Sequence, residues 1–319
     1  MKATTILLVA CALILPGAAM SQTYPAKTVR MVVGFPPGGP TDVLARIVAQ
    51  KLGEAWSQQV IVDNRAGASG MIGAELVARA APDGYTLLMV PVTFAVTPSL
   101  FSRMNYDSER DFTAVAQVAA APFILVVHPT LPVKTAKELV ALARARPGQL
   151  NYASASTGGM PHLAGELFNL MAGVKMVHVP YKGAAPATTD LLAGQVQLMF
   201  NNMLSAMPQV KAGRLRAVAV TSARRSNALL ELPAIAETLP GYEASGWYGL
   251  LAPAATPREA VARINAETGR IMKLPEVAQR LAGDGVEAVG TTPDQFAAYL
   301  RTEIAKWGRI VKTAGIKAD

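Results

Sequence analysis

A loop built largely from glycine and proline is the clearest place for chemistry in this chain. Residues 34–42 read Gly-Phe-Pro-Pro-Gly-Gly-Pro-Thr-Asp, after a strand-like apolar run at 29–33 and before an amphipathic helical pattern at 43–56. Glycines let a ligand approach the backbone closely, and prolines fix the direction of that approach. The first turn of the helix leaves N–H groups unpaired at the positive end of its dipole. The loop therefore predicts an anion-binding site.

A second loop of similar type occupies residues 153–162, between a strand-like run at 150–153 and another helical pattern. Its Ser156 and Thr157 either cap the N–H groups of the helix or donate hydroxyl hydrogens to a bound carboxylate. The two loops fall in different halves of the chain. Two helix N-termini that face each other across a cleft would hold an anion through backbone N–H groups, without an arginine.

Two shorter stretches add polar groups near the ends of strand-like runs. Lys182, with Gly183 beside it, either contacts an acid or lies on the rim of a cleft. Asn201 and Asn202 follow the run at 196–200, and the end of a strand is where α/β sheets place their ligands. A pair of asparagines is equally typical of a turn, so both interpretations stay open.

Catalytic, metal and cofactor sites find little support in the sequence. The three histidines show no HExxH spacing and have no cysteine companions, so no metal site is predicted. Residues 67–73 invite a dinucleotide-binding interpretation, but their glycines do not follow the G-x-G-x-x-G pattern. A tight turn with close helix packing is the better interpretation there. No cofactor is expected. A periplasmic serine hydrolase that uses Ser156 and His162, with Asp190 as third member, is the alternative function.

The chain begins with the pattern of a secretory signal peptide. The basic Lys2 is followed by an apolar run at 3–15 and by small residues, and this run is shorter than the about 20 residues that span a bilayer. We expect cleavage after Ala19 or Ser21 and export to the periplasm. Cys11 is the only cysteine and lies inside the run, so a lipoprotein-like cleavage box is the less favoured alternative. The mature chain is then expected to hold no disulfide.

Composition and charge exclude some functions. A chain of 319 residues with 51% hydrophobic residues can bury a sizeable core and is long enough for two domains. The formal net charge is +8, yet the basic residues are scattered, and the longest basic run is Arg224-Arg225 without interleaved aromatics. We therefore expect an exported, soluble protein that attracts anions and does not bind nucleic acid.

Strand-like runs alternate with helical patterns along the whole chain, which predicts an α/β fold with parallel sheets. Capping boxes that begin at Thr135, Thr256 and Thr292 mark the starts of three helices. No flexible linker is visible, so two domains should share crossing strands, for which 123–127 and 247–251 are the candidates. The strand-like runs lie at 29–33, 60–63, 86–90, 123–128, 150–153, 176–179, 196–200, 215–221, 247–251 and 286–289.

Eight short stretches also carry a family resemblance. They lie at 24–27, 32–42, 62–68, 82–86, 152–162, 179–183, 194–196 and 247–249. Together they resemble the Bug receptors, the periplasmic substrate-binding proteins of tripartite tricarboxylate transporters, and they cover the mature chain in order. One departure is visible at 154–159, which reads Ser-Ala-Ser-Thr-Gly-Gly where many relatives read Ser-x-Gly-x-Gly. Side-chain hydroxyls are expected to matter more here, so a relative's ligand is not transferred.

The resemblance implies a two-lobed, type II-like periplasmic-binding-protein fold of α/β class with two crossover strands between the lobes. It implies a signal peptide at 1–21, a first lobe at 22–122 plus 250–319, and a second lobe at 123–249. A small carboxylate would bind between the lobes, largely through backbone groups and bridging water. Carried over by motif, the implied ligand-binding residues are Phe35, Pro36, Pro37, Gly38, Gly39, Thr41, Asp42, Ser154, Ser156, Thr157, Gly158, Gly159 and His162. Lys182, Gly183 and Asn201 are added as candidates from their places near the ends of strand-like runs.

The expected function is therefore that of a receptor without catalytic activity. It would capture a dicarboxylate, a tricarboxylate, an aromatic acid or an acidic amino acid and deliver it to the membrane permease subunits of a tripartite tricarboxylate transporter. A ligand sensor that feeds a membrane kinase would use the same binding physics. Because capture-and-release receptors are commonly monomers, we expect a monomer.

Overall fold

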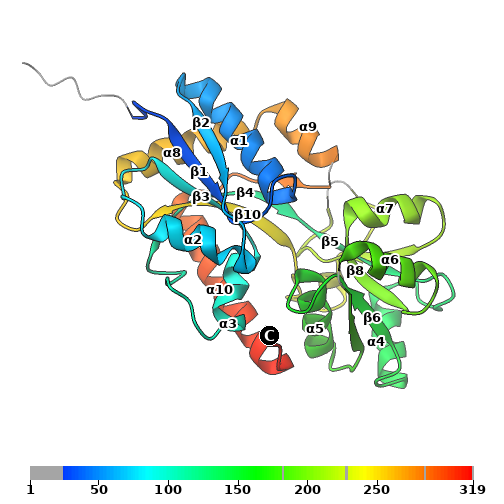
Figure 1. Cartoon of the computed structure of the whole chain (residues 1–319). Coiled ribbons are helices and arrows are strands. Elements are labelled where there is room, and N and C mark those ends of the chain that lie inside the picture. The colour runs from blue at the N-terminus through cyan, green and yellow to red at the C-terminus, as the bar shows by residue number, and fades with distance from the viewer. Residues whose placement is uncertain (1–23, 182, 227–228, 284, 318–319) are drawn as a thin grey trace, which may run out of the picture.

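The computed structural model describes residues 24–181, 183–226, 229–283 and 285–317, and they form two lobes that lie side by side (Figure 1). Each lobe is a sheet covered by helices, which confirms the predicted two-lobed α/β fold. The predicted signal peptide lies outside the described residues. Among those residues no helix is long and apolar enough to cross a membrane.

The first lobe is built on a six-stranded sheet of order β11-β4-β10-β3-β1-β2. β1 pairs in parallel with β2 and β3, whereas β10 runs antiparallel to β3 and β4. Alternate residues of β1 enter two different cores, so both faces of the sheet are covered. The strands are β1 (Val29–Val33), β2 (Val60–Asn64), β3 (Thr86–Pro91), β4 (Phe112–Ala121), β10 (Gly246–Pro253) and β11 (Glu287–Ala288).

Helices cover this sheet in two layers. One face packs against α1, α8 and α9, and the other against α2, α3 and α10 (Figure 1). The C-terminal helix α10 also contacts α5 of the second lobe, so it braces the two lobes against each other. These helices are α1 (Pro40–Trp56), α2 (Met71–Ala78), α3 (Thr93–Leu100), α8 (Arg258–Met272), α9 (Pro275–Gly283) and α10 (Pro293–Ala314), with a 3₁₀ turn η1 (Ala68–Gly70) before α2.

The second lobe is built on a five-stranded sheet of order β7-β6-β8-β5-β9. β6 is parallel to β7 and β8, and β5 is antiparallel to β8 and β9. Its strands are β5 (Phe123–Val127), β6 (Asn151–Ser154), β7 (Val177–Pro180), β8 (Leu198–Asn202) and β9 (Arg216–Val220). Its helices are α4 (Ala136–Ala145), α5 (Met160–Ala172), α6 (Ala184–Leu192) and α7 (Met203–Lys211), and a 3₁₀ turn η2 (Ile235–Glu237) follows β9.

Both sheets are mixed, so the prediction of parallel sheets is wrong for β5, β10 and β11, which run antiparallel to their neighbours. β4 and β5 are separated only by Pro122, so the chain passes straight from one sheet into the other. It then enters the second sheet against the direction of β8, and on its return β10 runs against β3 and β4. The predicted crossing segments 123–127 and 247–251 therefore flank the crossings, but each belongs to a single sheet.

Two local predictions have different outcomes. The capping boxes at Thr135 and Thr292 are present, with each side chain accepting a hydrogen bond from the third residue of its helix. The box at Thr256 is wrong, because the hydroxyl of Thr256 donates to the carbonyl oxygen of Pro253 instead. Helix α8 consequently begins at Arg258, with Pro257 as its N-cap.

Candidate functional site

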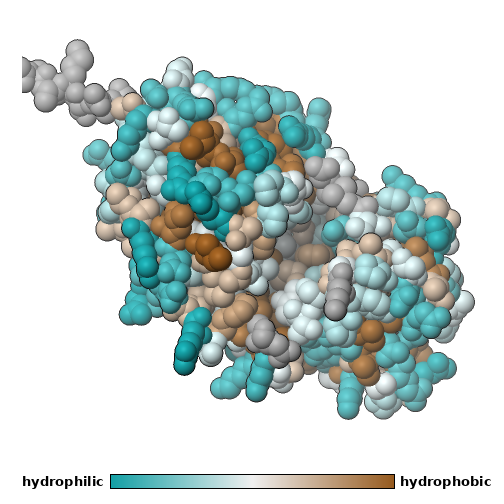
Figure 2. Space-filling model, viewed as in Figure 1, coloured by the Kyte–Doolittle hydropathy of each residue, from teal (hydrophilic) through white to brown (hydrophobic). Residues whose placement is uncertain are grey.

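The two glycine-rich loops lie on facing edges of the two sheets. β1, β3 and β4 all end at the edge of the first sheet where β4 crosses to the other lobe. In the second sheet β6, β7 and β8 end at the edge where β5 begins, because Phe123 pairs with Asn202. The loop after β1 and the loop after β6 therefore both lie on the side of their lobe that faces the junction, and Figure 2 shows a hollow between the lobes. Ligands of α/β sheets bind at such edges.

The two loops share one backbone geometry. Gly38 and Gly158 have φ values of 81° and 73°, a conformation that glycine adopts without strain. The next residues, Gly39 and Gly159, are the N-caps of α1 and α5 at φ −76°, ψ 166° and φ −72°, ψ 161°. A proline follows within the first two positions of each helix. Each lobe thus presents a helix N-terminus to the junction through the same turn.

The predicted residue Asp42 holds the first loop together from inside. Its carboxylate accepts hydrogen bonds from the N–H of Gly38 (2.8 Å), from Nε of Arg46 (2.9 Å) and from Nδ2 of Asn64 (2.9 Å). The side chain of Asn64 also donates to the carbonyl oxygen of Phe35. Burial opposes ionisation of Asp42, but the bonds from Arg46, Gly38 and Asn64 outweigh it and lower its pKa. Asp42 is therefore a buried, ionised support, and its charge is balanced by Arg46.

His162 takes the corresponding position in the second loop. Its Nδ1 accepts a hydrogen bond from the N–H of Gly158 at 3.0 Å, as Asp42 accepts one from Gly38 four residues before it. Its ring stacks on His178 with 3.6 Å between centroids and 8° between planes. Burial first, and then the neighbouring His178, lower the pKa of His162 to about 3. The ring is consequently neutral, with its proton on Nε2.

Ser154 completes this support. It is fully buried, and its hydroxyl donates to the carbonyl oxygen of Ser156 at 2.9 Å. Nε2 of His178 lies 2.6 Å from the same hydroxyl, so the ring N–H is the donor there. Burial lowers the pKa of His178 to about 4. A stacked pair of neutral histidines, His162 and His178, therefore holds the second loop through hydrogen bonds to Gly158 and Ser154.

The exposed residues of the loops are free to meet a ligand. Pro36, Pro37 and Gly38 are exposed on the first loop, and Ser156 and Thr157 are exposed on the second. Gly159 caps α5 without any side-chain hydrogen bond, so the capping alternative for these two hydroxyls is wrong. Within the described residues neither hydroxyl has a hydrogen-bond partner. Both can donate to a carboxylate at the junction.

The other predicted positions that the structure describes, Gly183 and Asn201, lie in the second lobe. Gly183, with φ 122°, donates its N–H to the carbonyl oxygen of Ala155 and precedes α6. Asn201 is 1% exposed, and its Oδ1 accepts from the N–H of Asn202, whose own side chain caps α7. Asn201 therefore shapes the turn, as the alternative interpretation held. Lys182 lies outside the described residues.

Two further residues escaped sequence reasoning. Thr93 begins α3 directly after β3, and its hydroxyl is buried without a hydrogen-bond partner within the described chain. The available signal was a threonine two residues after the end of a strand. His178 supports the second loop, but its spacing from His162 and Ser154 carries no recognisable pattern. The pairing of β6 with β7 brings His178 next to Ser154 and the second loop.

The arrangement does not form a hydrolase site. Nδ1 of His162 is occupied by the N–H of Gly158, and the carboxylate of Asp190 accepts from the hydroxyl of Tyr181. No hydrogen bond joins Ser156 to His162 in the described structure, so the serine lacks a base. Among the described residues no cluster of three potential ligands could hold a metal ion.

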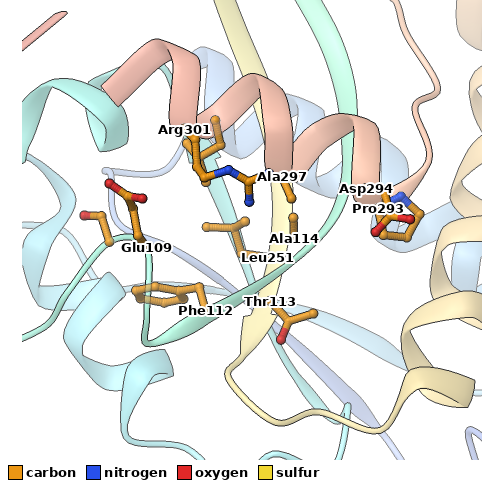
Figure 3. A pocket seen from close by; sticks show the side chains of 11 residues that line it. Glu109, Phe112, Thr113, Ala114, Leu251, Pro293, Asp294, Ala297 and Arg301 are labelled. Atoms are coloured by element: carbon orange, nitrogen blue, oxygen red, sulfur yellow. The ribbon is translucent and has the colours of Figure 1, made fainter. Parts of the chain in front are cut away.

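A separate cavity lies away from the loops, between α10 and the strands β4 and β10. Figure 3 shows Arg301 lying over Leu251 and Ala114, with Glu109 and Asp294 on opposite sides. The cavity has a volume of about 260 Å³. Because two carboxylates, of Glu109 and Asp294, and one guanidinium, of Arg301, line this cavity, its charge does not favour an anion.

Comparison with known proteins agrees with the fold. The model of the tripartite tricarboxylate transporter family receptor matches residues 44–316. BugT of Bordetella pertussis is 37% identical over 93% of this chain and 92% of its own length. A protein of R. palustris solved with adipate is 39% identical over 92% of this chain and all of its own, with a TM-score of 0.75. MatC from Rhodopseudomonas palustris, with bound malate, is 31% identical over 90% of this chain and 100% of its own, with a TM-score of 0.71.

These matches span nearly the whole described chain and agree with the resemblance drawn from its motifs. The matched proteins are receptors that bind solutes and not enzymes, which confirms the expectation of a non-catalytic protein. The chain belongs to the family of tripartite tricarboxylate transporter receptors.

Proposed function

We propose that this receptor binds a small organic carboxylate between its lobes through the two glycine-rich loops. One observation carries the proposal: matched turns place the N-termini of α1 and α5 at the same junction, with the free hydroxyls of Ser156 and Thr157 beside the second. A charge-assisted hydrogen bond contributes about 1.5–3 kcal/mol, and a micromolar ligand needs about 8 kcal/mol. A handful of such bonds is sufficient. Adipate and malate, bound by two relatives, belong to this ligand class.

In this proposal the residues of the loops have two roles. The residues at 35–39 and 156–159, of which Pro36, Pro37, Gly38, Ser156 and Thr157 are exposed, contact the ligand, and the buried Asp42, Ser154 and His162 hold the loops in place. The division of the chain into a lobe of 22–122 plus 250–319 and a lobe of 123–249 is part of the same proposal. Closure must gain its free energy from contacts that both lobes make with the acid.

A thermal-shift screen of the mature chain tests this binding. The panel contains dicarboxylates, tricarboxylates, aromatic acids and acidic amino acids, with neutral and phosphorylated compounds as controls. An acid at about 100 times its dissociation constant should add about 2.7 kcal/mol of stability, which is a shift of several degrees. A panel without any carboxylate that shifts the melting temperature would contradict the proposal.

Removal of a hydroxyl gives a more local test. Ser156→Ala or Thr157→Ala should weaken binding of the acid found in the screen by about tenfold or more, because a hydrogen bond to a charged group contributes about 1.5–3 kcal/mol. Neither substitution should lower the melting temperature of the free protein, because neither hydroxyl has a hydrogen-bond partner within the described residues. Thr313→Ala, at an exposed position of α10, is the matched control. Unchanged affinity in both loop variants would move the ligand away from this loop.

We further propose that the chain is exported to the periplasm with residues 1–21 removed, and that it delivers its ligand as a monomer to the membrane permease of a tripartite tricarboxylate transporter. The family to which the chain belongs supports this partner. Affinity capture from membranes, with the acid present, should recover permease subunits. Recovery of a membrane kinase instead would favour a sensor.

A further inference from the structure

An apolar cavity of about 200 Å³ lies directly beside the first loop. Gly38 and Pro40 of that loop form one side of it, and Val43 and Leu44 of α1 continue the same wall. Tyr248 of β10 forms another part of the lining. No charged residue lines the cavity within the described chain. The polar surface of the loop and this apolar space thus meet at the N-terminus of α1.

Another part of the lining lies close to the second lobe. Leu281 of α9 and Val286, just before β11, line that side. Between them, a Cβ built on Gly285 would lie 2.9 Å from Cβ of Met203, the first residue of α7. Gly285, next to the lining residue Val286, therefore lies against α7 of the other lobe. The lining residues all come from elements of the first lobe, so a ligand that fills the cavity would lie in the first lobe, next to the place where it meets α7 of the second.

The size and lining of the cavity suit a ring or a short hydrocarbon chain. A dry cavity of about 150 Å³ lined by apolar side chains binds benzene. The ring of Tyr248 can pack edge or face against an aromatic ligand. Burial raises the pKa of Tyr248 to about 12, so its phenol stays uncharged at neutral pH. Apart from the phenol of Tyr248, no side chain that lines the cavity within the described chain could pair with the hydroxyl or carboxylate groups of a compact polar acid.

We infer that the ligand is a carboxylate with an apolar body, whose carboxylate lies at the two loops and whose ring or hydrocarbon chain occupies this cavity. The inference rests on the proposed function and specifies its substrate class. It separates aromatic, alicyclic and long-chain acids from compact, hydroxyl-bearing di- and tricarboxylates, which would leave polar groups unpaired in the cavity.

Titration calorimetry of the mature chain with benzoate, cyclohexanecarboxylate, malate and citrate tests this class. At least one of the two ring acids should bind about tenfold or more tightly than malate and citrate, because each buried methylene contributes about 0.8 kcal/mol. Val43→Thr keeps the shape of the side chain and adds a hydroxyl, so it should weaken the ring acid about fivefold or more. Val286→Phe fills the cavity and should weaken it further. Val177→Thr, at an exposed position of β7, is the matched control and should have no effect.

The outcomes distinguish this inference from the proposed function. If malate or citrate binds more tightly than both ring acids, or if neither Val43→Thr nor Val286→Phe changes the affinity of a ring acid, the apolar subsite is wrong while carboxylate binding stands. If none of the four acids binds and the wider panel of carboxylates also fails, the proposed function itself is wrong. The melting temperature of each variant verifies that it is folded.

Discussion

At the scale of single residues, the buried and exposed members of the loops do different work. Asp42 and His162 each accept the N–H of the glycine four residues before them, although one is an ionised carboxylate and the other a neutral imidazole. Either side chain supplies the acceptor that this turn requires. The exposed Ser156 and Thr157 form no hydrogen bond within the described chain and are left for a ligand. Residue type alone could not separate these two roles, because both groups consist of polar side chains in the same short loop.

The stacked pair His162 and His178 makes the second loop sensitive to acid. Both pKa values are lowered in the folded protein, to about 3 and about 4, whereas an unfolded histidine titrates near about 6.5. Below about pH 6.5 the unfolded chain therefore binds protons that the folded chain does not. The free energy of unfolding decreases as the pH is lowered, down to the pKa values of the folded protein. Lowering the pH from about 7 to about 5.5 should reduce the free energy of unfolding by about 1 kcal/mol for each of the two histidines.

Urea unfolding at these two pH values measures the loss. His178→Gln removes one of the two titrating groups, so its stability should fall less than that of the parent protein over the same interval. His128→Gln, which alters the histidine outside the pair, should preserve the full loss. An equal pH dependence in the parent and in His178→Gln would contradict this account of the pair.

At the scale of elements, the turn before each helix depends on a glycine at positive φ. Gly38 lies in the turn before α1, and Gly148, after the end of α4, serves as a comparison outside the candidate site. Their φ values are 81° and 73°, and a Cβ built on either meets no atom within 4 Å. Alanine at either site should therefore cost about 1 kcal/mol of stability through backbone strain alone. Only Gly38→Ala should also weaken ligand binding, because only Gly38 lies in the candidate site. Calorimetry and thermal melting of both variants would check this pair, and equal binding by the two would show that the turn before α1 is not needed.

The sequence predicted most elements because their signals are local. Glycine and proline marked both loops, and β-branched runs marked β1 and β5. The longest strand of the described chain, β4, was missed because Phe112–Ala121 contains five alanines and a glutamine, which have low strand propensity. Its strand conformation is set by pairing with β10, a contact between residues distant in the chain. The support by His178 was missed for the same reason, because only the pairing of β6 with β7 places it under the loop.

At the scale of the whole molecule, Thr221 ties together the two passages of the chain between the lobes. It is fully buried, and its hydroxyl accepts the N–H of Phe123 at 2.8 Å and lies 3.1 Å from the carbonyl oxygens of Phe123 and Ala244. Thr221→Val keeps the volume and removes these bonds. It should lower the free energy of unfolding by about 1–3 kcal/mol, because the N–H of Phe123 is left without a partner. Thr221→Ser keeps the hydroxyl and should retain most of the stability. Similar losses in both variants, measured by urea unfolding, would assign the effect to packing.

The central claim is that one ligand engages both lobes through the two glycine-rich loops. Hydrogen–deuterium exchange of the mature chain, with and without the acid found by thermal shift, tests it most directly. The account predicts slower exchange on binding at 35–43 in the first lobe and at 154–163 in the second, in the same experiment. Protection confined to one loop, or protection only around the cavity beneath α10, would contradict it.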